Sequence, residues 1–284
     1  MRPLLLFAVA ICGCLCVRAA EPQLAVINAV ISSSEDGPPI AADYRFTPGD
    51  YLYFTFQIAG FAVHSDNQGE TKKISLSYEI VPQDEQGRPL LEPVNGEIKT
   101  TLAPEDKNWV PKRRASFLLP SFLAVGSFHL HVTAKDILGK TETSRDVPFL
   151  IGGVKLTPAT SITIENFRFL RRENDTETLS LAAYSPGDTV FAHFVMAGFQ
   201  TGPDNRCHVS YGITVLDPSG KAFIQEPNAA KLEEGGFYPA QFVPGTLALQ
   251  MGKATERGSY TILLEARDLI ANTRYEMKQT FSIE

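Results

Sequence analysis

The sequence predicts an all-β protein made of two tandem antiparallel β-sandwiches. First, the stretch from Pro48 to Phe61 returns as Pro186 to Phe199, at an offset of 138 residues in a chain of 284. Such a long repeat indicates two copies of one domain. Second, each copy starts a segment in which apolar and polar residues alternate with period two, as in a strand buried on one face. Third, such segments recur roughly 8–12 residues apart between Gly/Pro turns, without a helical period.

The N-terminus has the features of a targeting segment. A positive charge at Arg2 precedes an apolar run from Pro3 to Gly13 and a small-residue cleavage site ending at Ala19. We therefore predict a signal peptide over residues 1–19 and an exported protein that is periplasmic, on the cell surface or secreted. The apolar run is too short for a transmembrane helix, and no later stretch is long enough for one.

Three of the four cysteines, Cys12, Cys14 and Cys16, lie near this N-terminus. The run from Ile11 to Cys14 resembles a bacterial lipoprotein box, so a lipid anchor at Cys14 is the alternative to a freely released protein. Cleavage after residue 19 leaves Cys207 alone, which excludes an intrachain disulfide. Strand parity places Cys207 inward, so we expect a buried thiol with a structural role.

The chain carries 26 basic and 32 acidic residues, for a formal net charge of −6. A nucleic-acid surface needs clustered positive charge to neutralise phosphates, and this balance does not supply it. We therefore predict no nucleic-acid partner.

The repeat divides the chain into sandwiches over residues 21–151 and 155–284. The first begins with Leu24 to Asn28 and the second with Ile162 to Asn166, again at an offset of 138. The stretch from Ile151 to Pro158, which contains a Gly pair, is the expected linker.

Strand parity assigns the expected core. In the central strand the inward residues are Leu52, Phe54, Phe56 and Ile58, matched by Val190, Ala192, Phe194 and Met196. In the next strand they are Ile74, Leu76, Tyr78 and Ile80, matched by Cys207, Val209, Tyr211 and Ile213. In the penultimate strand they are Phe128, Leu130, Val132 and Ala134, matched by Tyr260, Ile262, Leu264 and Ala266. Phe149 and Phe281 lie on the final strands.

Both copies have a Gly-containing turn, Asp84 to Arg88 and Asp217 to Lys221, where glycine supplies a positive φ. After Glu92-Pro93 and Glu226-Pro227 each copy is expected to enter a long loop unlike that of its counterpart.

The run from Gly258 to Asp268 resembles the Gly-x-Tyr start of the penultimate strand in bacterial immunoglobulin-like and polycystic-kidney-disease-type domains. The resemblance implies an immunoglobulin-like sandwich in which Tyr260 forms a tyrosine corner. The first copy has Phe128 there and lacks the corner hydroxyl. The chain also lacks the cysteine pair of antibody domains, and Trp109 lies outside the strand where those domains place their tryptophan.

The two long loops are the expected binding surfaces because they differ most between the copies. The first, Ala103 to Arg114, contains Trp109 with the cations Lys107, Lys112, Arg113 and Arg114 around it. The second, Lys231 to Phe242, contains Phe237 and Tyr238 beside Glu233 and Glu234. Aromatic residues with flanking charges form recognition patches for proteins or glycans, and the cations imply an acidic partner. The alternative is that Trp109 and Phe237 plug the open ends of their sandwiches.

We find no nucleophile elbow, zinc-protease motif, phosphate loop or dinucleotide fingerprint, so we predict no enzyme and no cofactor. His129 and His131 project from the same face of one strand and would start a Zn or Cu site if a third ligand joined them. The simpler interpretation is that they are solvated surface histidines, and the same applies to His193 and His208. The pairs Asp66-Asn67 and Asp204-Asn205 are interpreted as turn residues, with a calcium site as the alternative.

These observations predict an exported, non-catalytic binding or scaffolding protein that recognises a protein or glycan of the cell envelope or exterior. Two alternatives stay open: a periplasmic metal-handling protein using surface histidines, and a hydrolase with an unrecognised carboxylate site.

Overall fold

The computed structural model describes residues 23–65, 71–103, 105–106 and 109–284. Over this part the chain is all-β, with strands β1 to β17, one short 3-10 turn, η1 (Pro203–Asn205), and no α-helix. None of the described residues forms a helix with the length and hydrophobicity needed to cross a membrane. The expected signal peptide, the lipoprotein-like box, Asp66-Asn67 and Lys107 lie outside the described residues.

The strands from β1 to β9 form two sheets, and we call this part the N-terminal half. Its strands are β1 (Ala25–Ser32), β2 (Arg45–Phe46), β3 (Tyr51–Ala59), β4 (His64–Ser65), β5 (Lys72–Asp84), β6 (Val94–Leu102), β7 (Lys112–Leu118), β8 (Gly126–Asp136) and β9 (Thr141–Ile151). The small sheet has the order β1-β3-β7. The large sheet has the order β2-β9-β8-β5-β4, with β6 also paired to β5.

The strands from β10 to β17 form two further sheets, the C-terminal half. They are β10 (Thr163–Leu170), β11 (Ala183–Tyr184), β12 (Thr189–Ala197), β13 (Cys207–Leu216), β14 (Ala222–Glu234), β15 (Phe242–Gln250), β16 (Gly258–Asp268) and β17 (Thr273–Ile283). Their orders are β10-β12-β15 and β11-β17-β16-β13-β14. Apart from β4, the two halves therefore repeat one strand order, in which β2 and β11 each pair in parallel with the last strand of their half.

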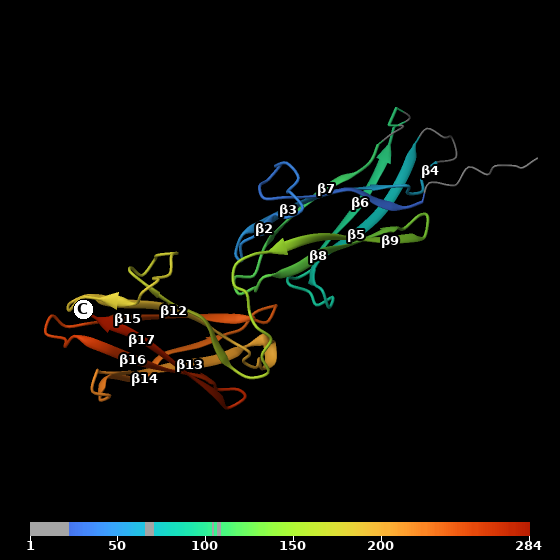
Figure 1. The fold of residues 1–284 in the computed structure, drawn as a ribbon. Coiled ribbons are helices and arrows are strands. Elements are labelled where there is room, and N and C mark those ends of the chain that lie inside the picture. Colours follow the sequence, from blue (N-terminus) through green and yellow to red (C-terminus); the bar gives the residue numbers. More distant parts are fainter. Residues whose placement is uncertain (1–22, 66–70, 104, 107–108) are drawn as a thin grey trace, which may run out of the picture.

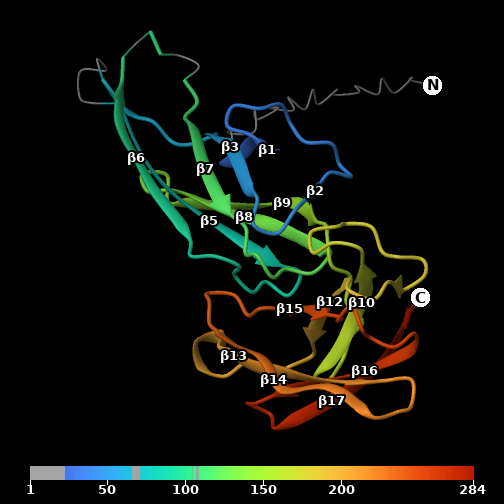
Figure 2. The same cartoon turned by 90° about the vertical axis from the view of Figure 1, so that its left-hand side faces the viewer.

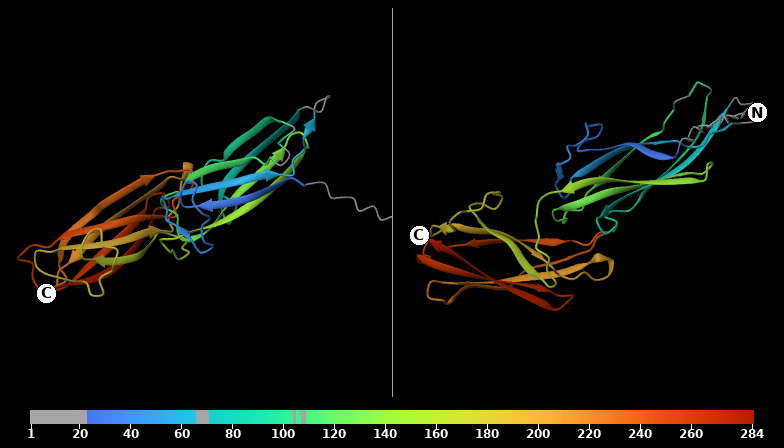
Figure 3. Two further views of the ribbon diagram at one scale, coloured as in Figure 1. Left: turned by 90° about the horizontal axis from the view of Figure 1, so that it is seen from above. Right: turned by 45° about the vertical axis from the view of Figure 1, so that its right-hand side comes forward.

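Each sheet draws its strands from one half only, and the halves follow one another along the molecule at an angle (Figure 1). Turned by 90°, the blue-to-green N-terminal half lies above the yellow-to-red C-terminal half (Figure 2). Further views show the same end-to-end arrangement, with the C-terminus far from the junction (Figure 3).

The expected inward residues of β3, β8, β12, β13 and β16 are all buried, which confirms their assignment by strand parity. On β5, Ile74, Leu76 and Ile80 are buried, whereas Tyr78 is only partly buried. The core of each half therefore lies between its small and large sheets, where the apolar faces pack together.

Two unusual backbone positions recur in both copies. Asn28 and Asn166 have φ values of 48° and 53°, and a β-bulge interrupts the pairing of each strand there. Gly60 and Gly198 have φ values of 73° and 71°, and an added Cβ would lie 2.1 Å and 2.4 Å from a neighbouring backbone oxygen. The repeated Asn and Gly are therefore required by backbone geometry.

The expected tyrosine corner is present in the second copy. Tyr260 is buried and donates its hydroxyl to the carbonyl of Glu256 at 2.8 Å. Burial raises the pKa of Tyr260. The first copy has Phe128 at this position and packs it against Phe149 without a hydroxyl.

The expected long loops are shorter than predicted. Most of the stretch after Glu92-Pro93 forms β6, and Glu226-Pro227 lies within β14. Lys112, Arg113 and Arg114 begin β7, while Lys231 to Glu234 end β14. The connections are therefore residues 103–111 and 235–241. The sequence pattern predicts a loop at Lys231 to Glu234 because β14 is exposed along most of its length and shows no buried alternation.

Candidate functional site: the junction between the halves

A side chain of the C-terminal half completes the core of the N-terminal half. Tyr238, in the β14–β15 connection, is only 9% exposed and belongs to the apolar core of the N-terminal half. It donates its hydroxyl to Asp84 Oδ2 at 3.0 Å, and Arg88 Cζ lies 5.9 Å from its ring centroid. A buried hydroxyl with a carboxylate acceptor and a cation over its ring makes a directional contact.

Electrostatics at Tyr238 favour the neutral phenol. Burial is the largest cause that raises its pKa to about 12, and the hydrogen bond to Asp84 and the charge of Asp84 add to it. Arg88 acts in the opposite direction. Asp84 also accepts the backbone N–H groups of Gln86 and Arg88, so its carboxylate is fully engaged.

Further hydrogen bonds at Gln241 and in the linker position the two halves relative to each other. The backbone N–H of Gln241 donates to the carbonyl of Phe122 at 3.0 Å. The backbone N–H of Ala124 donates to the side-chain Oε1 of Gln241 at 2.6 Å. From the linker, the Val154 carbonyl accepts the N–H of Val125 at 2.8 Å.

A small apolar cluster, separate from the cores of the two halves, lies beside these hydrogen bonds. Val195, Ala197 and Phe242 of the C-terminal half are buried, with Phe122 and the linker residues Val154 and Leu156 packed on them. The rings of Phe122 and Phe242 meet edge to face with centroids 6.0 Å apart. Directional hydrogen bonds and buried aromatic contacts together give the junction a defined geometry.

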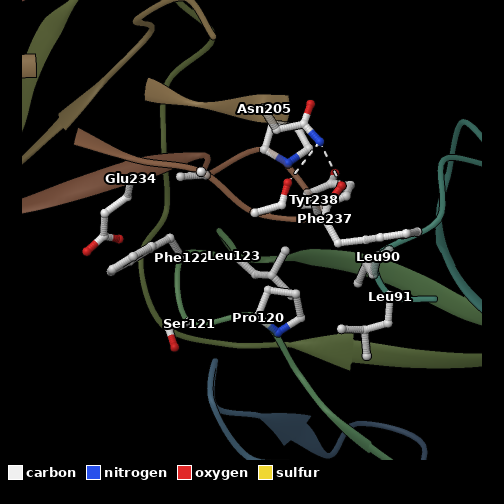
Figure 4. Close-up of a pocket in the computed structure, with 14 residues that line it drawn as sticks. Leu90, Leu91, Pro120, Ser121, Phe122, Leu123, Asn205, Glu234, Phe237 and Tyr238 are labelled. Atoms are coloured by element: carbon white, nitrogen blue, oxygen red, sulfur yellow. Dashed lines mark hydrogen bonds between the residues drawn. The ribbon is translucent and has the colours of Figure 1, made fainter. Parts of the chain in front are cut away.

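A pocket of approximately 250 Å³ opens at this junction, with walls from both halves. Leu90, Leu91 and residues 120–123 line it from the N-terminal half, and Asn205 and residues 234–240 from the C-terminal half (Figure 4). We call it the junction pocket. Phe237 lines it and is 48% exposed, whereas the neighbouring Tyr238 is buried.

Asn205 holds the loop that forms one wall of this pocket. Its side-chain amide donates to the carbonyls of Gly236 and Phe237 at 3.2 Å and 2.7 Å (Figure 4). Asp204 and Asn205 lie in η1 with φ values of 56° and 52°. Their assignment as turn residues is confirmed for this copy.

The structure separates the sequence-predicted binding residues. Trp109 is partly buried, packs on the core of the N-terminal half and meets Phe61 at 6.4 Å between centroids, as expected of a plug. Phe237 is exposed, so its interpretation as a plug is wrong. Tyr238 is buried in the other half, which strand parity within one repeat does not reveal.

The cations expected around Trp109 lie on a strand. Lys112 and Arg114 are exposed, and Arg114 Nη2 pairs with Asp36 Oδ1 at 2.8 Å. Arg113 is partly buried and donates to the carbonyl of Lys112. One of the three charges is therefore already neutralised within the chain.

His129 and His131 form polar contacts on the large sheet of the N-terminal half. His131 Nδ1 lies 2.7 Å from Asp146 Oδ1, and His129 Nε2 lies 3.2 Å from Gln83 Oε1. Among the described residues no group of three or more His, Cys, Asp or Glu side chains is arranged to hold a metal ion. His208 differs from the expected solvated histidine, since its Nε2 is buried and has no hydrogen-bond partner in the described part of the chain.

Two buried aspartates bind backbone amides at matched positions of the two halves. Asp136 and Asp268, which match in the repeat, are 2% and 1% exposed. Each carboxylate accepts three backbone N–H groups: Ala62, Leu138 and Gly139 for the first, and Gln200, Ile270 and Ala271 for the second. Cys207 is fully buried, and burial raises the pKa of its thiol.

No family model matches the chain, and no curated protein matches it. Among solved structures, it is similar to the C-terminal domain of the Streptococcus agalactiae antigen I/II polypeptide BspA, with 10% identity and a TM-score of 0.28, covering 89% of this chain and 99% of that one. It is also similar to the C-terminal domain of the Streptococcus pyogenes antigen I/II-family protein AspA, with 9% identity and a TM-score of 0.28, covering 89% and 98%. A TM-score this low carries no argument about the function of this chain.

Proposed function

We propose that this chain is an exported, non-catalytic binding protein of two immunoglobulin-like sandwich domains, over residues 21–151 and 155–284. We further propose that the junction pocket holds an apolar side chain of a protein partner. The repeated strand order and the Tyr260 corner support the immunoglobulin-like assignment. The composition of the N-terminal segment supports export.

The observation that carries the proposal is an exposed aromatic residue on an apolar pocket between two halves that are joined by hydrogen bonds and apolar contacts. The pocket, at approximately 250 Å³, is smaller than the roughly 300–1,000 Å³ typical of small-molecule sites. A single side chain of a partner suits that volume, and interface hot spots occupy such pockets. Phe237 would lie against that side chain.

The lining charge indicates the surroundings of the partner residue. Glu234 lines the pocket, and no Lys or Arg does so among the described residues. A partner that places Lys or Arg next to its apolar residue would complement this carboxylate.

The engaged carboxylates support a non-catalytic role. A general acid or base needs a titratable group free to exchange a proton with a ligand. Asp136 and Asp268 are buried and bonded to backbone amides. Cys207 is buried among aliphatic side chains.

Capture from an envelope or surface extract, quantified by mass spectrometry, tests the proposal. A partner captured by the wild type should fall by about tenfold or more with Phe237→Ala, the loss of a hot spot. Leu181→Ala is the matched control, because Leu181 is 67% exposed and lies outside the pocket. Both variants should keep the wild-type melting temperature.

The double change Arg113→Ala, Arg114→Ala tests the competing surface on β7. If this change removes the partner and Phe237→Ala does not, recognition occurs at β7 and the junction-pocket proposal is wrong. Capture that is unchanged by both variants would also contradict the proposal.

A further inference from the structure

A second concave surface lies on the outer face of the small sheet of the C-terminal half. It is a groove of approximately 810 Å³, formed by β10, β12, β15, Thr178 and residues 153–155 of the linker. We call it the linker groove. Its basic lining residues are Lys155, Arg168 and His193, and no Asp or Glu lines it among the described residues. This is unusual in a chain with a net charge of −6.

The basic residues are aligned by the sheet register. Arg168 on β10 is paired with His193 on β12, and His193 is paired with Thr246 on β15. Directly paired residues project from one face with Cβ atoms about 4.5–5.5 Å apart. The three side chains therefore form one row across the sheet, and its two basic members lie side by side.

In the matching row of the N-terminal half, the cation is paired with an acidic side chain. There the register partners are Val30, Thr55 and Arg114. Arg114 is bonded to Asp36, which lies in the β1–β2 connection, with Nη2 and Oδ1 2.8 Å apart. An acidic side chain from a neighbouring loop thus neutralises the cation of this row.

In the row of the C-terminal half, the cation Arg168 is not paired with a carboxylate among the described residues. In the corresponding β10–β11 connection the acceptor is a neutral group, because Arg168 Nη1 donates to the carbonyl of Thr176 at 3.2 Å. In the described part of the chain Arg168 forms no ion pair. Glu165, on the same face, is bonded instead to the backbone N–H of Thr157 at 2.9 Å.

Apolar residues lie beside this row. Val195 and Phe242 are buried under Val154 and Leu156 of the linker, so the accessible apolar surface of the groove comes from the exposed Pro244 and the partly buried Val154. The groove volume falls within the roughly 300–1,000 Å³ of small-molecule sites, unlike that of the junction pocket. Basic side chains next to apolar ones suit a compact ligand that has an anionic group attached to an apolar body.

We propose that the linker groove binds a small carboxylate ligand with an apolar body. The guanidinium of Arg168, a ring N–H of His193 and the hydroxyl of Thr246 would donate to the carboxylate. The apolar body would lie on Pro244 and Val154, with Lys155 adding positive charge from the linker. This site is distinct from the junction pocket and does not depend on it.

Titration of the full chain with naphthoate, followed by NMR, tests the proposal. Naphthoate should bind saturably at millimolar concentration or below and shift the ring resonances of His193. The neutral isostere naphthamide should bind about tenfold more weakly or worse, because it loses the charge-assisted hydrogen bonds.

Two variants locate the site. Arg168→Gln should weaken naphthoate binding by about tenfold, and Lys155→Gln, at an exposed linker position, should weaken it by a few-fold. Arg114→Gln changes the matched row of the other half and should leave binding unaltered. If naphthoate does not saturate, if naphthamide binds equally well, or if Lys155→Gln and a folded Arg168→Gln both bind like the wild type, the proposal is wrong.

Discussion

The β6–β7 and β14–β15 connections occupy the same place in the two halves but make opposite contacts. In the N-terminal half, Trp109 packs on the core of its own half, next to Phe61. In the C-terminal half, Tyr238 leaves its own half and fills the core of the other. The strands on either side of the two connections pair in the same order.

The difference shows how two halves with the same strand order can form an asymmetric junction. The strands keep their apolar alternation because every change of parity would move a whole face from core to solvent. The connections are free of this constraint and change more readily. One of them supplies the contacts that join the halves, including Tyr238 to Asp84 and Gln241 to residues 122–124.

The largest effect should come from breaking the two cores at their matched aromatic positions. Phe56 and Phe194 are 0% and 2% exposed at equivalent places on β3 and β12. Replacement of either by Ala should cost about 3–5 kcal/mol of unfolding free energy, from lost burial and the cavity left behind. Urea denaturation measures this loss, with the exposed Tyr51→Ala as control. A cost below about 1 kcal/mol at either site would contradict the equivalence of the two cores.

A smaller effect should distinguish the two connections. Tyr238→Phe leaves Asp84 without its hydroxyl donor and should cost about 1–2 kcal/mol. Because Tyr238 belongs to the core of the N-terminal half, hydrogen exchange should speed up on β5 and β8 although the change lies in the other half. Trp109→Ala should affect the N-terminal half alone. Faster exchange confined to the C-terminal half in Tyr238→Phe would show that the junction does not couple the halves.

The junction should also weaken at high pH. The pKa of Tyr238 is raised from 10.0 to about 12, chiefly by burial and then by Asp84, so docking favours the protonated phenol. Its contribution to stability is therefore complete below pH 10 and is lost as the pH rises towards 12. Tyrosinate absorbance of the wild type minus that of Tyr238→Phe isolates this group, and Asp84→Asn should lower its pKa. A difference titration centred at the ordinary value would contradict a docked Tyr238.

The last prediction compares a matched pair of buried positions inside the sheets. Cys207 on β13 corresponds to Ile74 on β5, and the two are 0% and 2% exposed. A thiol reagent should modify Cys207 roughly a hundredfold or more slowly in the native protein than in denaturant, because reaction requires local opening. Ile74→Cys should place an equally protected thiol in the N-terminal half. Rapid native reaction at only one of the two positions would show that the halves differ in local stability.

Sequence reasoning identified the all-β class and the repeat because both depend on local periodicity. Val243, Leu247 and Leu249 on β15 also alternate and are buried, so this strand had a detectable signal within the stretch after Glu226-Pro227. Strand β14 had none, because it is an exposed edge strand. A strand without a buried face has no periodic pattern to detect.

By itself, the sequence determined the inward residues of the main strands and the positive φ values of the turn glycines Gly87 and Gly220, which are 77° and 83°. Each depends on one residue's backbone conformation or on the side-chain period of one strand. Only the tertiary structure decided that Tyr238 fills the other half, that Phe237 is exposed on the junction pocket, and that Arg168 and His193 share a row. These depend on strand register and on packing between distant segments, which no local pattern encodes.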